Sequence, residues 1–69
     1  MTVLLNRREV LREDAEDLIE EHHRLVRELN DGVMDARIDG NHHVADMLVE
    51  QSDLHFRTAT TLEHLLDEL

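Results

Sequence analysis

Histidine is the residue type in this chain best suited to chemistry, and the sequence contains six of them among 69 residues, with no cysteine. They are His22, His23, His42, His43, His55 and His64. Imidazole binds transition metals, transfers protons and changes its charge near neutral pH. A helical projection places His22 and His55 within apolar stripes, whereas the other four fall on polar faces or at a turn. These two histidines are therefore the first candidates for a site.

Three interpretations of His22 and His55 follow from their expected pairing. In an antiparallel hairpin with this turn, the numbers of facing residues add up to about 72 to 79, which places His22 opposite a stretch that includes Gln51 and His55. With Thr58, these side chains would form a polar layer across the middle of a bundle. Such a layer fixes register through hydrogen bonds, binds a divalent metal, or responds to pH. We favour the hydrogen-bonded layer and keep the metal site as an alternative.

A second group of metal-ligand side chains lies around the expected turn. It consists of Asp39, His42, His43 and Asp46. Carboxylates and imidazoles at such spacing can hold a divalent cation loosely at a surface. The simpler interpretation is that Asp39 serves the turn while both histidines are solvated. The di-iron element Glu-x-x-His occurs once, at Glu20 and His23, and its side chains project outward, so we expect no ferritin-like centre.

Catalysis has few other residues to draw on. The chain lacks Cys, Lys and Tyr, and its only serine is Ser52. There is no glycine-rich loop that would bind a phosphate group. We therefore expect a protein that is not an enzyme and that has no cofactor other than a divalent metal at one of the two histidine sites.

Two long amphipathic helices must position these side chains. Asn6 and Glu9 have the spacing of a capping box, which starts a helix near residue 7 that runs either over 7–31 or, as we favour, over 7–38. Asn41 caps a second helix over about 41–68. The first apolar stripe is Leu11, Ala15, Leu18, Ile19, His22, Leu25, Val26 and Leu29. The second is Val44, Met47, Leu48, Gln51, Leu54, His55, Thr58, Ala59, Leu62, Leu65, Leu66 and Leu69.

The expected fold class is all-α, a single domain over 1–69 that forms an antiparallel two-helix hairpin. A chain this short buries little surface on its own, so we expect it to dimerise into a four-helix bundle. Ala45, Val49 and Phe56 lie outside the second stripe and widen the apolar surface. Exposed apolar surface indicates a binding partner. The favoured function is thus protein–protein interaction by a homo-oligomer, with Val49 and Phe56 in the interface.

The charge of the chain limits its partners and its environment. Seventeen acids against seven bases, all arginine, give a net charge of −10. This excess favours a halophilic source and disfavours nucleic acid or an anionic membrane as partners. Without an apolar span or a signal peptide at the start, we expect a cytoplasmic protein. The topology resembles small antiparallel bundle dimers that bind RNA in plasmid copy control, an alternative that requires Arg7, Arg8 and Arg12 to gather at one end.

Overall fold

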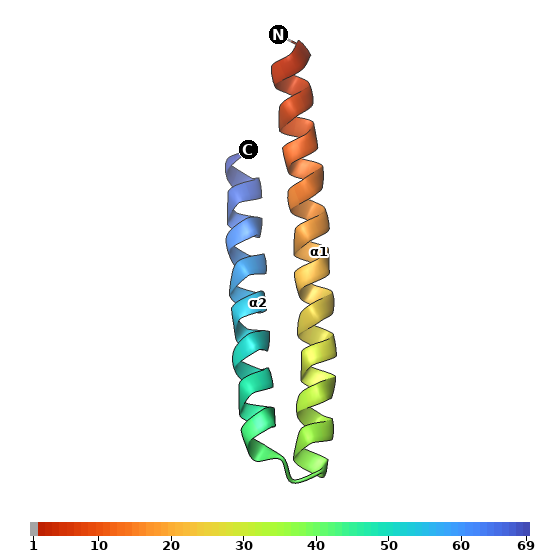
Figure 1. The fold of residues 1–69 in the computed structure, drawn as a ribbon. Helices are drawn as coiled ribbons and strands as arrows, with labels where there is room; N and C mark the ends of the chain where they lie inside the picture. The colour runs from red at the N-terminus through yellow and green to blue at the C-terminus, as the bar shows by residue number, and fades with distance from the viewer. Residues whose placement is uncertain (1) are drawn as a thin grey trace.

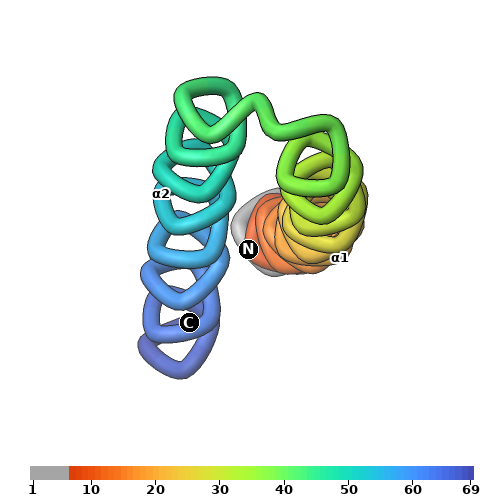
Figure 2. Tube along the Cα trace, turned by 90° about the horizontal axis from the view of Figure 1, so that it is seen from below, coloured from red at the N-terminus to blue at the C-terminus, as the bar shows by residue number. Residues whose placement is uncertain are grey.

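The computed structural model describes the backbone of residues 2–69 and the side chains of residues 7–69, and Figure 1 shows two antiparallel helices. Helix α1 spans Thr2–Ile38 and helix α2 spans His42–Glu68. The hairpin measures 58 × 15 × 12 Å, and the first turns of α1 extend beyond the end of α2 (Figure 1). A view from the loop end shows that the helices are connected only there (Figure 2). The expected all-α hairpin is confirmed.

Helix α1 begins at Thr2 rather than after Asn6. Neither proline nor glycine occurs in its first turns, so nothing in the sequence prevents the helix from starting early. The side chain of Asn6 lies outside the described residues. Further along, α1 continues through Asn30, Asp31 and Gly32 without a break and ends at Ile38.

The turn between the helices is closed by backbone hydrogen bonds. Gly40 has a φ of 76°, and the N–H of Asn41 donates to the carbonyl of Ala36 at 2.8 Å. This is the long-range bond of a Schellman motif, which needs a left-handed residue just past the helix end. Asn41 then caps α2, because its Oδ1 accepts a hydrogen bond from the N–H of Val44 at 3.4 Å. A local sequence signal thus fixes where the chain reverses.

The contact between the helices is a heptad-like stripe that we call the seam. Its residues are buried or half-buried and alternate in spacing between three and four. On α1 the seam consists of Ala15, Ile19, His22, Val26, Leu29, Val33 and Ala36. On α2 it consists of Ala45, Leu48, Ser52, His55, Ala59, Leu62 and Leu66.

Small side chains dominate the buried part of the seam. The buried apolar residues are Val33, Ala36, Ala45 and Ala59, and Ser52 is the buried polar residue. Among residues 7–69, no large side chain is fully buried. Alanine and serine allow the helix axes to approach closely, but they remove little apolar surface from water. The hairpin alone therefore lacks the core that a stable domain of this size needs.

The outer faces of both helices are charged. Arg57 pairs with Asp53 at 2.8 Å and Arg24 pairs with Glu21 at 3.5 Å, both within one helix and both exposed. Such pairs stabilise a helix by a few tenths of a kcal/mol at most. Over residues 2–69, neither helix has a stretch long and apolar enough to cross a membrane.

The two glycines are expected to respond in opposite directions to alanine. Gly32→Ala should raise the free energy of unfolding by up to about 1 kcal/mol, because Gly32 lies inside α1. A Cβ there meets Cδ1 of Leu48 at 3.3 Å, the end of a flexible side chain that can shift. Gly40→Ala should lower the free energy of unfolding by about 1 kcal/mol, because its φ is left-handed. Urea denaturation measures both changes, and a common sign would contradict this account.

Candidate functional site

The two candidate histidines meet within the seam. His22 on α1 and His55 on α2 are half-buried, and their Nδ1 atoms lie 2.8 Å apart. The ring centroids are 5.0 Å apart and the rings are tilted by 35°. The heptad spacing of the seam places both rings here, because each follows a seam residue by three positions, Ile19 on α1 and Ser52 on α2.

The short distance between the two Nδ1 atoms determines the hydrogen chemistry of the pair. A hydrogen bond needs one donor and one acceptor, so one ring carries its hydrogen on Nδ1 and the other presents a lone pair there. If both Nδ1 atoms carried hydrogen, neither could accept and the bond would be lost. Without the shared hydrogen, the two lone pairs converge on one point. This pair of nitrogens can therefore share a hydrogen or bind a cation.

The other expected members of the polar layer do not join it within the hairpin. Gln51 and Thr58 are exposed, and the hydroxyl of Thr58 donates to the carbonyl of Leu54 in its own helix. Gln51 precedes His55 by four positions and Thr58 follows it by three, so both lie on the side of α2 next to the His55 ring. The layer in the hairpin consists of His22 and His55 alone, flanked by two polar side chains that are open to solvent.

The histidines and carboxylates near the turn do not form a site in this structure. Asp39, His42, His43 and Asp46 are all exposed. Across residues 7–69, no group of three or more His, Asp or Glu side chains is placed to hold a metal ion. A single hairpin therefore provides at most the two nitrogens of His22 and His55 at the centre of its seam.

Seven residues of the two expected apolar stripes lie beside the seam rather than in it, along one side of the hairpin, and we call this surface the leucine face. It consists of the exposed residues Leu11, Leu18, Val44, Met47, Leu54 and Leu65 and the half-buried Leu25. Apart from Leu11, each directly precedes a seam residue, so all lie on the same flank of the hairpin. The sequence did contain the signal, since leucine recurs at 11, 18 and 25, every seven residues.

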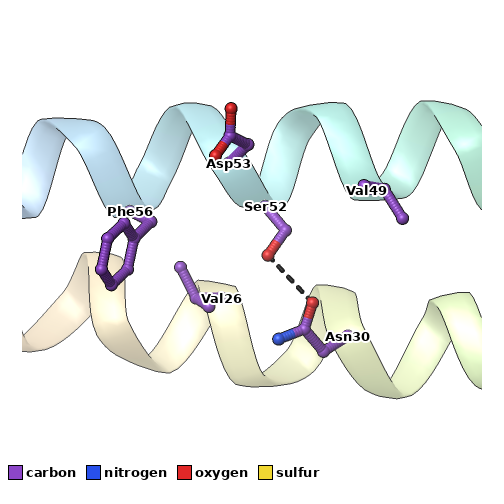
Figure 3. A pocket seen from close by; sticks show the side chains of 6 residues that line it. All are labelled: Val26, Asn30, Val49, Ser52, Asp53 and Phe56. Atoms are coloured by element: carbon purple, nitrogen blue, oxygen red, sulfur yellow. Dashed lines mark hydrogen bonds between the residues drawn. The ribbon is translucent and has the colours of Figure 1, made fainter.

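The residues that directly follow seam positions form the opposite side, which we call the groove side. Val49 and Phe56 are about half exposed here and border a shallow groove of about 280 Å³ (Figure 3). At its floor, the hydroxyl of Ser52 donates to Oδ1 of Asn30 at 3.0 Å. Ala45, expected in the same apolar strip, is only 1% exposed because it lies in the seam. The expectation that Ala45 widens the exposed apolar surface is wrong.

His23 also lies on the groove side, where it takes part in a contact that the sequence did not predict. Its Nε2 lies 3.0 Å from Oε1 of Glu63, and its ring meets Phe56 edge-on at 6.5 Å between centroids. The pair links α1 to α2 across the seam. Both side chains are partly open to solvent, so the contact contributes little to stability and chiefly marks the polar character of this side.

The fold and its central histidine pair define a helical hairpin with a polar layer and one uncovered apolar flank. A comparison of the chain with protein families, with curated proteins and with solved structures finds no match. What the protein does has therefore to be argued from its own surfaces.

Proposed function

We propose that this chain is a non-enzymatic assembly module that acts as a homodimer, in which two hairpins form a four-helix bundle across their leucine faces. The observation that carries the proposal is the distribution of apolar side chains. The seam buries mainly alanines, whereas most of the leucine face remains exposed to water. Covering that face with a second copy supplies the large buried side chains that a single hairpin lacks.

The leucine face follows most of the part of the hairpin in which the two helices lie side by side. That part is as long as α2, which has 27 residues, or about 40 Å, because the first turns of α1 extend beyond it. A two-fold symmetric dimer pairs this face with itself and leaves no apolar flank of the same kind open. The same arrangement places the half-buried seam residues Leu29, Leu48 and Leu62 near the centre of the bundle.

The charge of the chain fits a protein that works in salt. Each chain carries −10, so two copies repel each other until salt screens the repulsion. The screening length falls from about 10 Å at 0.1 M salt to about 3 Å at 1 M. We propose a cytoplasmic protein of a halophilic cell, and we expect no nucleic-acid or membrane partner because of the excess of acids.

The test is the molar mass of the untagged chain in solution. Sedimentation equilibrium at 0.15 M and 2 M NaCl should give about twice the chain mass of 8.1 kDa. Association should be tighter at the higher salt because the repulsion between acidic copies is screened. A monomer at both salt concentrations would contradict the proposal. A dimer that weakens in 2 M NaCl would contradict the account of its charge.

In such a dimer the groove side faces outward. We propose it as the surface for another protein, with Val49 and Phe56 as the apolar contacts. Asp53 and Glu63 border this side, so a helix with basic residues beside its apolar stripe fits it best. The two surfaces have separate roles, because one holds the copies together and the other remains available.

A further inference from the structure

We propose that the dimer binds a divalent transition metal ion between four histidines, His22 and His55 of each copy. This inference rests on the proposed dimer, because one hairpin contributes only two ligands. It assigns a role to the histidine pair beyond holding the two helices in register.

The spacing of the two nitrogens suits a shared cation. Nδ1 of His22 and Nδ1 of His55 are 2.8 Å apart. Zinc binds imidazole nitrogen at about 2.0–2.1 Å, so two ligands lie roughly 2.9 Å apart at a right angle and roughly 3.4 Å apart in a tetrahedron. The two nitrogens need to move apart by about 0.6 Å to reach the tetrahedral spacing. Imidazole is a ligand that zinc, copper and nickel all accept.

The direction of the pair points toward a second copy. Leu18 and Leu25 lie four positions before and three positions after His22, so its ring shares a flank of α1 with the leucine face. On α2 the corresponding neighbours of His55 are Gln51 and Thr58. Polar side chains on this flank of α2 therefore lie beside the histidine pair, at Gln51 and Thr58, and again at Thr61, which precedes the seam residue Leu62. In the proposed dimer, Gln51 and Thr58 supply the oxygen atoms nearest in sequence that can accept hydrogen bonds from the outer nitrogens of the imidazoles, as groups around metal ligands do.

The position of the histidine pair along the hairpin allows the pairs of two copies to lie at the same level in the dimer. The seam has seven residues on each helix, and His55 is the fourth of the seven on α2. A two-fold axis parallel to the helices places equivalent residues at the same height. A two-fold axis perpendicular to the helices reverses one hairpin relative to the other. When the two hairpins then overlap along their full length, residues in the middle of the seam still lie at the same height. Both arrangements bring four imidazoles to one level.

The experiment measures zinc binding by the untagged protein. Calorimetry gives the affinity, and elemental analysis after dialysis gives the amount of zinc bound. We expect one zinc per dimer, and His22→Ala and His55→Ala should each weaken binding by at least about 100-fold, because each removes two of four ligands. The double variant with His42→Ala and His43→Ala is the matched control. It removes as many imidazoles from the exposed turn and should bind zinc as the wild type does.

The outcomes separate the metal site from the dimer. A dimer that binds no zinc, or that binds one per chain and still does so after His55→Ala, would overturn the site and leave the dimer standing. A monomer with and without zinc would contradict the dimer itself. If the alanine variants lose helicity, cobalt in the wild-type protein gives a second readout. Visible absorption bands of nitrogen-bound cobalt are expected, and their absence would also overturn the site.

Discussion

Leu54→Glu is expected to convert the dimer into a monomer. Leu54 is 48% exposed in the hairpin and lies in the middle of the leucine face, so the proposed dimer would bury one Leu54 from each copy. Losing the burial of two leucines and forcing two carboxylates into the interface costs on the order of 4 kcal/mol or more per dimer. That corresponds to at least a 1,000-fold weaker association. Because a single hairpin lacks large buried side chains, the monomeric variant should also unfold at a lower temperature than the wild-type dimer.

The matched control for Leu54→Glu is Phe56→Glu. Phe56 lies two residues further along α2, is 53% exposed and belongs to the groove side. The same change of charge there should leave the dimer intact and remove the binding of a protein partner. Sedimentation equilibrium of the two variants decides which flank holds the copies together. If Phe56→Glu dissociates the dimer and Leu54→Glu does not, the interface is on the groove side and the proposed arrangement is wrong.

Changing one histidine of the central pair is expected to affect stability in the opposite direction from changing both. His55→Leu leaves Nδ1 of His22 without its partner in a half-buried position, which should cost about 1–2 kcal/mol in the free energy of unfolding. Replacing both residues by leucine removes the unpaired group and adds apolar contact. The double variant should therefore be at least as stable as the wild type, and by about 1–3 kcal/mol more stable if the layer is buried in the dimer.

Urea denaturation of the wild type, both single variants and the double variant forms a complete cycle. We expect a coupling of at least about 2 kcal/mol between the two positions, because each single change should cost about 1–2 kcal/mol and the double change should cost nothing. The double variant should also associate less uniquely, because a polar layer within an apolar interface selects one register. Additive effects of the two substitutions would show that the 2.8 Å contact contributes nothing to the fold.

Local features of the sequence determined the hairpin. The absence of proline and the periodic apolar residues of both segments favour long helices. At the turn, Gly40 takes the left-handed conformation and Asn41 caps the second helix, and both act through backbone groups only a few residues away. The pairing of His22 with His55 also follows from the position of the turn, since the turn fixes which residues stand opposite each other.

Only the tertiary structure decided which flank of each helix faces the other. Helix α2 carries two adjacent apolar stripes, and the helical spacing placed Val44, Met47 and Leu54 in the expected contact stripe and Ala45 outside it. The structure instead buries Ala45 and leaves these three larger residues exposed, whereas Ala59, which the stripe included, is buried. Small side chains let the two helices approach closely, and this depends on what the opposite helix presents at the same height. The large residues are left on the flank, where a second copy is the proposed cover.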